Sequence, residues 1–168
     1  MQRAIHIFPQ LQNISLIERL RKKYDPLYGF IPPHITLVFP FESEIPTQKL
    51  EQHVRNSLAR VHPFTIQLQR VTASFDRYLF LNVKKGNDQI IKLHDLLYSG
   101  PLKNFQSRSH TYTPHLTVGR LKSDEDLEAA LNHTQTFETS FETVVTEVKT
   151  EIIEGNGDST IEFTVPLS

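Results

Sequence analysis

The sequence predicts an α+β fold of two sheet-and-helix lobes whose antiparallel sheets face a central cleft. Three observations favour this fold class. Strand, helix, strand, helix and strand patterns follow one another in the same order twice along the 168 residues. The pentapeptide at 33–37, PHITL, returns at 114–118 as PHLTV. No linker rich in proline, glycine or serine separates the halves, so we expect residues 1–168 to form one domain of two pseudo-symmetric lobes.

The first half of the chain alternates between two kinds of pattern. Short runs of β-branched and aromatic residues predict strands, and apolar residues at three- and four-residue spacing predict helices. The first helix has Asn13 or Ser15 as its cap and ends at Pro26, because proline disrupts a helix. The predicted elements are a strand at 4–8, a helix at 13–25, a strand at 34–41, a helix at 48–60 capped by Thr47, and a strand at 64–75.

The second half repeats this order with different side chains. A strand at 78–85 leads into a helix at 87–100, and a polar loop then precedes the second copy of the pentapeptide. Only the segment order and the shared pentapeptide indicate a duplication. The remaining predicted elements are a strand at 115–121, a helix at 124–132 capped by Ser123, and strands at 141–154 and 160–168 joined by a turn at 155–159.

Each pentapeptide predicts a strand with one polar and one apolar face. Alternate side chains of a strand share a face, so His34 and Thr36 project together. Ile35, Leu37 and Phe39 are expected on the other face. The proline before each histidine removes a backbone donor at the first position of the strand, where proline is tolerated.

The second copy has the same alternation, with His115 and Thr117 on the polar face. If the lobes are related by a pseudo-twofold axis, the two polar faces line opposite walls of one cleft. Imidazole titrates near about pH 6.5, so two histidines supply a general acid and a general base together. Threonine hydroxyls donate hydrogen bonds to anionic oxygens. The four side chains therefore suit a metal-independent in-line displacement at phosphorus.

The residues that surround the motifs have simpler interpretations. Arg120 lies three residues beyond Thr117, and strict alternation places it on the opposite face unless a bulge at Gly119 turns it back. Tyr24 and Tyr28 precede the first motif and are expected either to stack on a base or to cover the loop. The basic run Arg19, Arg21, Lys22 and Lys23 is typical of a solvated helix face, and His6, His53, His62, His94, His110 and His133 are interpreted as surface or capping residues.

The composition excludes several classes of protein. The chain contains no cysteine, so disulfides, thiolate metal sites and cysteine nucleophiles are excluded. No zinc-binding or phosphate-loop motif is present, and we expect no metal and no cofactor. A formal net charge of -1 gives no field for binding a long nucleic acid. There is no apolar leader or membrane span, so we expect a cytoplasmic protein, and the oligomeric state stays open.

The paired motifs resemble those of the 2H phosphoesterase superfamily, which includes 2′,5′ RNA ligase-like proteins and cyclic nucleotide phosphodiesterases. The resemblance rests on His34-Ile35-Thr36-Leu37 and on 115–118, HLTV, about 80 residues later in a small chain without cysteine. The segments at 22–37, KKYDPLYGFIPPHITL, and 112–120, YTPHLTVGR, further resemble a small bacterial branch of that family.

The resemblance implies a bilobal fold, no metal, and hydrolysis or ligation at a 2′ or 3′ phosphoester of a small nucleotide or an RNA end. It also implies that His34 is the proton donor and His115 the acceptor, while Thr36 and Thr117 bind phosphate oxygens. The residues alone do not assign this direction, because the motifs are nearly equivalent. Two other classes stay open: a non-catalytic RNA or nucleotide binding module that uses the same cleft, and an interaction scaffold with a purely structural motif.

Overall fold

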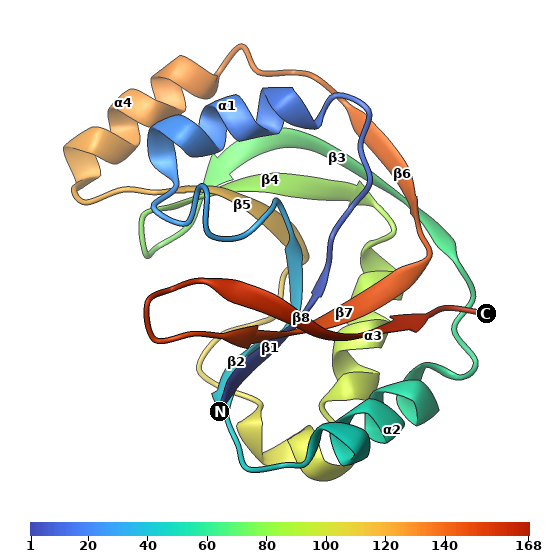
Figure 1. The fold of residues 1–168 in the computed structure, drawn as a ribbon. Helices are drawn as coiled ribbons and strands as arrows, with labels where there is room; N and C mark the ends of the chain where they lie inside the picture. Colours follow the sequence, from blue (N-terminus) through green and yellow to red (C-terminus); the bar gives the residue numbers. More distant parts are fainter.

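The structure, a computed structural model, describes residues 1–168 and contains two four-stranded antiparallel sheets with helices, which confirms the predicted fold class (Figure 1). The strands of the first sheet are ordered β2-β1-β7-β8, and those of the second β5-β4-β3-β6. The elements are β1 (Gln2–Ile7), α1 (Ile14–Tyr24), β2 (Ile35–Glu42), α2 (Thr47–Leu58), β3 (Phe64–Ala73), β4 (Tyr78–Lys85), α3 (Asn87–Leu97), the 3₁₀ helix η1 (Gly100–Phe105), β5 (His115–Arg120), α4 (Asp124–Thr134), β6 (Phe141–Val145), β7 (Glu147–Ile153) and β8 (Ser159–Pro166).

The two strands that carry the motifs are both edge strands. β2 ends the first sheet and β5 ends the second, and these two strands contact each other. Each is paired inside its sheet with the strand that precedes it in sequence, β1 for β2 and β4 for β5. The predicted repetition of segments therefore brings the two motifs to the junction of the sheets.

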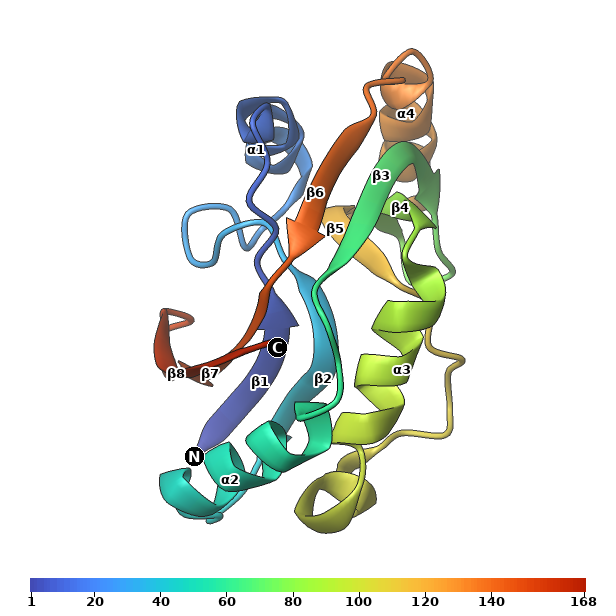
Figure 2. The same ribbon diagram turned by 90° about the vertical axis from the view of Figure 1, so that its right-hand side faces the viewer.

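The lobes differ from the two halves of the sequence, because the halves exchange helices and strands. Helices α1 and α4 pack on strands of the second sheet, and α2 and α3 pack on strands of the first. Figures 1 and 2 show α1 and α4 together at one end of the molecule and α2 and α3 at the other. The first sheet is completed by the C-terminal strands β7 and β8, whereas β3 lies beside β4 in the second sheet.

Two predicted element boundaries were wrong. The segment at 141–154 was expected to be one strand, but it divides at Thr146 into β6 in the second sheet and β7 in the first. The chain passes directly from one sheet to the other there, as Figure 2 shows. Thr47 was expected to cap α2 but is its first residue, since its hydroxyl donates to Glu162 of β8. Ser123 caps α4 as predicted, because its hydroxyl accepts from the amide of Asp126 at 3.1 Å.

Both motif strands contain one extra residue at the equivalent position, three residues after the histidine. The register between β1 and β2 shifts at Leu37, and that between β4 and β5 shifts at Val118. Such an extra residue turns the following side chains to the other face of the strand. Phe39 is consequently 47 % exposed and does not lie inside with Ile35, as alternation had predicted. The matched position in both copies supports the pseudo-symmetry.

The apolar sides of the motif strands belong to one continuous core. Ile35 and Leu37 of β2, and Leu116 and Val118 of β5, are fully buried in a single cluster that runs through both lobes. A shared core fixes the two sheets relative to each other. The polar sides of the motifs are therefore held at a defined separation.

Candidate active site

The two motif histidines have the same local geometry. His34 Nδ1 donates to the carbonyl oxygen of Pro32 at 2.8 Å, and His115 Nδ1 donates to that of Thr113 at 2.6 Å. Each bond joins the imidazole to a carbonyl two residues earlier, so it orients the ring and keeps the proton of the neutral form on Nδ1. In both residues Nε2 is left as the nitrogen that can exchange a proton with a ligand.

Burial holds both imidazoles in their neutral forms. It is the largest cause that lowers the pKa of His34 to about 3, followed by the charge of His6, with smaller contributions from Arg21 and His115 and an opposing one from the bond to Pro32. The influence of His115 on His34 reflects the contact between β2 and β5. Burial also lowers the pKa of His115, against the opposing effect of its bond to Thr113.

The threonines lie beside the histidines on the same strand faces. Thr36 and Thr117 are half-buried, like His34 and His115. Thr36 pairs with His6 of β1, and Thr117 pairs with Phe80 of β4. The structure thus brings all four predicted site residues to the junction of the two sheets, two from each edge strand.

The neighbours of the two imidazoles differ. The His34 ring lies against that of His6, with ring centroids 4.4 Å apart, and His6 Nε2 is 2.8 Å from Glu151 Oε1. The His115 ring stacks on Phe80 at a centroid distance of 3.6 Å and an interplanar angle of 17°. His6 is only 2 % exposed, so its interpretation as a surface residue was wrong. A histidine within an otherwise apolar strand is the signal that could have identified it.

Three side chains of the second half bind the free backbone edge of β2. The Tyr112 hydroxyl donates to Thr36 O at 2.7 Å, and His94 Nδ1 donates to Leu37 O at 2.8 Å. The Tyr98 hydroxyl accepts from the amide of Phe39 at 3.0 Å. We call Tyr112, His94 and Tyr98 the edge clasp. It attaches the first motif strand to the helix and loop that lead into the second motif.

The ring of Tyr112 stacks on that of His94 at 3.7 Å, which makes the clasp a packed unit. His94 is 5 % exposed, so its interpretation as a surface residue was also wrong. Neither residue belongs to a recognisable sequence motif. No local pattern predicts the clasp, because its partners are backbone atoms 57 and 76 residues away.

Arg21 organises the loop before the first motif. It is 1 % exposed, and its guanidinium donates to Asp25 Oδ2 at 2.8 Å and to Ile31 O at 2.8 Å. It also donates to Leu27 O at 3.3 Å and Glu18 Oε1 at 3.1 Å. The prediction of a solvated basic face was therefore wrong for this residue. A buried arginine is retained only when its donors are paired, and here the pairing shapes the approach to His34.

The bulge in β5 turns Arg120 to the motif face of the sheet. Arg120 pairs with Tyr78, and its guanidinium lies 5.1 Å from the centre of that ring. Gly119 is required at the bulge, since a Cβ there would lie 2.7 Å from Tyr24 Cβ. The alternation-based prediction for Arg120 was wrong, and the bulge considered as the exception is present.

A basic hollow of about 610 Å³ lies at the end of β5, lined by residues that include Lys22, Lys23, Arg120 and Lys122. Tyr24, one of the tyrosines expected to stack on a base or to cover the loop, is packed there, with its hydroxyl 2.7 Å from His133 Nδ1. Tyr28 is 39 % exposed in the loop before the first motif.

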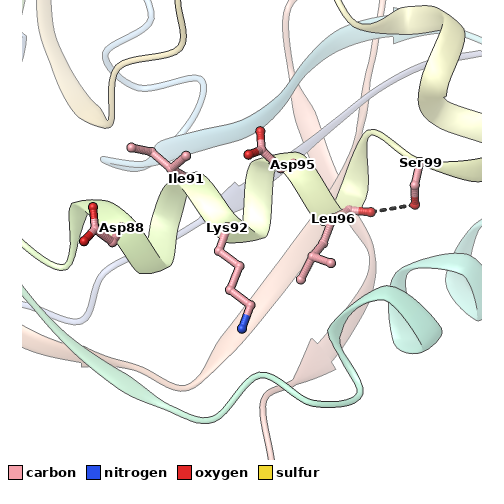
Figure 3. A pocket seen from close by; sticks show the side chains of 6 residues that line it. All are labelled: Asp88, Ile91, Lys92, Asp95, Leu96 and Ser99. Carbon is pink, nitrogen blue, oxygen red and sulfur yellow. Dashed lines mark hydrogen bonds between the residues drawn. The ribbon is translucent and has the colours of Figure 1, made fainter.

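A second hollow, of about 470 Å³, follows the outer side of α3 (Figure 3). Asp88, Lys92, Asp95 and Ser99 line it with two apolar side chains, and the Ser99 hydroxyl is engaged by the carbonyl of Leu96 at 2.7 Å. None of the motif residues borders it. Its mixed charges and lack of convergent donors make it a poorer candidate than the junction of the edge strands.

No group of three or more histidine, aspartate and glutamate side chains converges to form a metal site. None of the helices combines the length and apolar character that crossing a membrane requires.

The neutral burial of His34 predicts a pH dependence of stability. Its folded pKa lies below its unfolded value of about 6.5, so the unfolded chain binds more protons between these two values. Stability is therefore complete above about pH 6.5 and falls as the pH drops towards 3. Partial exposure keeps the slope due to His34 below about 1.4 kcal/mol per pH unit.

Urea unfolding at pH 7.5 and 5.0 measures this effect. The difference in unfolding free energy between the two pH values is expected to be smaller for His34→Gln than for the wild type. An identical difference in both proteins would show that His34 carries no such proton linkage.

Comparisons with known proteins agree with this geometry. The sequence profile described as the 2′-5′ RNA ligase superfamily matches residues 7–156. A Bacillus cereus protein named "Putative phosphoesterase" is 35 % identical over 132 residues, which cover 75 % of this chain and 73 % of that protein. A Bacillus licheniformis protein named "Putative phosphoesterase" is 28 % identical over 148 residues, covering 86 % of each chain.

Two solved structures have the same fold. The protein TT0787 of Thermus thermophilus superimposes with a TM-score of 0.68 and 17 % identity, covering 99 % of this chain and 98 % of that one. E. coli LigT complexed with 3′-AMP superimposes with a TM-score of 0.61 and 17 % identity over the same shares of the two chains. The profile match covers most of the chain, and the chain therefore belongs to the 2′-5′ RNA ligase superfamily, the 2H phosphoesterases.

Proposed function

We propose that this protein is a metal-independent phosphoesterase that hydrolyses a 2′,3′-cyclic phosphate or a 2′,5′ linkage at a small nucleotide or RNA end. The observation that carries the proposal is the matched pair His34 and His115, each with Nδ1 bound to a backbone carbonyl and each followed by a threonine on the same strand face. Two such imidazoles from opposing edge strands suit an in-line displacement, in which the attacking and leaving oxygens lie on opposite sides of phosphorus.

In the proposed reaction, one imidazole takes a proton from water as the water oxygen bonds to phosphorus. The other imidazole gives its proton to the ribose oxygen as the bond between that oxygen and phosphorus breaks. Thr36 and Thr117 donate to the non-bridging oxygens, where negative charge increases in the transition state. The family resemblance gives His34 the donor role and His115 the acceptor role. Run in reverse with a ribose hydroxyl, the same groups would ligate.

A nucleotide ligand fits the family and the charge around the site. Structures of E. coli LigT have been solved with 3′-AMP, NADP+, ATP and phosphate. In this chain Arg120 lies on the motif face of β5, where it adds a positive charge five residues from His115. The four site residues carry no acidic group that would oppose a phosphate.

The test is a screen of 2′,3′-cyclic nucleotides and 2′,5′-linked dinucleotides in the presence of EDTA. We expect turnover of at least one substrate with the chelator present, and the product shows which ester bond breaks. Saturable binding without turnover between pH 4 and pH 9 would instead identify a nucleotide-binding module. Activity that EDTA abolishes and added metal restores would contradict the proposed chemistry.

A further inference from the structure

The surroundings of the two motif imidazoles are chemically opposite, although their backbone geometry is the same. His34 lies edge-on against another imidazole, that of His6, and His115 lies flat on the benzene ring of Phe80. The face of an aromatic ring attracts a cation, whereas a second titratable imidazole repels one when it carries charge itself. This asymmetry bears on which histidine holds a proton.

His6 and Glu151 form a buried pair beside the first motif. Both side chains are about 2 to 3 % exposed, and His6 Nε2 lies 2.8 Å from Glu151 Oε1. His6 pairs with Thr36 across β1 and β2, so it lies on the same sheet face as Thr36 and His34. Glu151 pairs with Ala4, two residues before His6, and so belongs to that face as well.

The pair is incompletely satisfied by the protein. His6 Nδ1 and Glu151 Oε2 are both buried and have no hydrogen-bond partner. Each unpaired buried polar atom costs about 1 to 3 kcal/mol, and an apolar pair of similar volume would avoid that cost. Stability therefore gives no reason for this pair at this position, which points to a role in the adjacent site.

Other charged groups near His34 are already engaged. Arg21 of α1 is bound to Asp25, and Lys149 of β7, which pairs with His6, lies 3.0 Å from Glu147. His115 of β5 faces His34 across the junction of the sheets. His6 is consequently the titratable group in direct ring contact with His34 on its own sheet.

We propose that the His6–Glu151 pair holds His34 in its neutral form, so that His34 is the proton acceptor and His115, on Phe80, is the proton donor. This inference rests on the proposed function and reverses the direction that the family resemblance implies. His34 Nε2 takes the proton of the attacking water while the new bond from water oxygen to phosphorus forms. His115 Nε2 gives its proton to the departing ribose oxygen while the bond from that oxygen to phosphorus breaks. His6 and Glu151 are positioning residues, since neither needs to touch the substrate.

The direction of the pKa shifts agrees with this geometry. The charge of His6 is the second cause, after burial, that lowers the pKa of His34 to about 3. Burial lowers the pKa of His115, and no charged neighbour contributes to that shift. When the two imidazoles share a single proton, that proton therefore resides on His115.

The first experiment identifies the donor by its leaving group. His34→Ala and His115→Ala are each assayed on a nucleoside 2′,3′-cyclic phosphate and on a nucleoside 4-nitrophenyl phosphodiester, whose phenolate leaves without a proton. The donor variant should lose about 10² to 10⁴-fold on the cyclic phosphate and recover most of that loss on the nitrophenyl ester. We expect this recovery for His115→Ala only. Recovery for His34→Ala instead would overturn the inference.

The second experiment tests the His6–Glu151 pair without relying on turnover. The His34 imidazole is titrated by NMR in the wild type and in His6→Phe/Glu151→Leu, which replaces both polar groups by apolar ones and should fold. We expect the pKa of His34 to rise by about one to three units in the double variant, and the acid-side limb of kcat/KM to move up equally. His6→Gln provides a second variant with the same expected direction.

The matched control is Arg3→Met/Glu162→Leu, which removes another buried pair of the first sheet, 2.8 Å apart, from the opposite face of β1. It should leave the His34 titration unchanged. An unchanged titration in His6→Phe/Glu151→Leu would show that the pair is only structural. If the wild type turns over no phosphodiester, the proposed function fails, while the NMR titration still decides whether the pair controls the proton on His34.

Discussion

Replacement of either motif histidine by alanine is expected to lower kcat/KM for a 2′,3′-cyclic nucleotide by about 10² to 10⁴-fold. His34 and His115 each move one proton in the transition state of the proposed reaction, so each replacement removes one of the two transfers. The double variant should be little slower than the worse single variant, because the two groups act as a unit. Steady-state hydrolysis followed by product separation measures the effect.

His62→Ala is the matched control. His62 is exposed, binds the carbonyl of Ser168 and lies outside both motifs. Its replacement should leave kcat/KM within a factor of about two to three, on the order of a surface substitution. Full activity of His34→Ala or His115→Ala on the cyclic phosphate would remove the acid-base assignment altogether.

The largest effect on stability is expected for Arg21→Met. The change leaves Asp25 buried without its ionic partner and deprives the carbonyls of Leu27 and Ile31 of their donors. Breaking a buried pair in this way costs about 3 to 5 kcal/mol, much of it from the uncompensated charge. Urea unfolding at pH 7.5 measures the loss. Because the same loop leads into His34, kcat/KM should fall as well.

Arg55→Met provides the comparison for Arg21. Arg55 is also paired with an acid four residues away, Glu51, but its side chain is 45 % exposed. An exposed pair of this kind contributes about 0 to 1 kcal/mol. Equal losses for the two variants would show that the network around Arg21 is unimportant and that only helical pairing matters.

The periodic features of the sequence predicted much of the fold. Alternation identified the two motif strands, and apolar spacing identified all four α-helices, because both patterns follow from local backbone geometry. The exchange of helices between lobes left no local pattern. A helix buries its apolar face equally well on either sheet, so the spacing in 14–24 does not indicate that α1 packs on β5. The division at Thr146 was missed for the same reason, since both parts are extended.

The site divides in a similar way. Repetition of a histidine and a threonine singled out the four residues at the junction of the sheets. His6, Arg21 and Tyr112 were missed because each acts through a partner far from any motif, and a lone polar residue in a sequence resembles a surface residue until its burial is known. The bulge at Val118 reversed the side on which Arg120 lies, and only the pairing with β4 reveals it.

The edge clasp also affects how the protein behaves at high concentration. An edge strand with free amide and carbonyl groups can recruit a strand from a neighbouring molecule and so begin aggregation. On β2 the carbonyls of Thr36 and Leu37 and the amide of Phe39 are already occupied by side chains of the same chain. The clasp thus blocks intermolecular strand addition at the strand that has to remain accessible to a ligand.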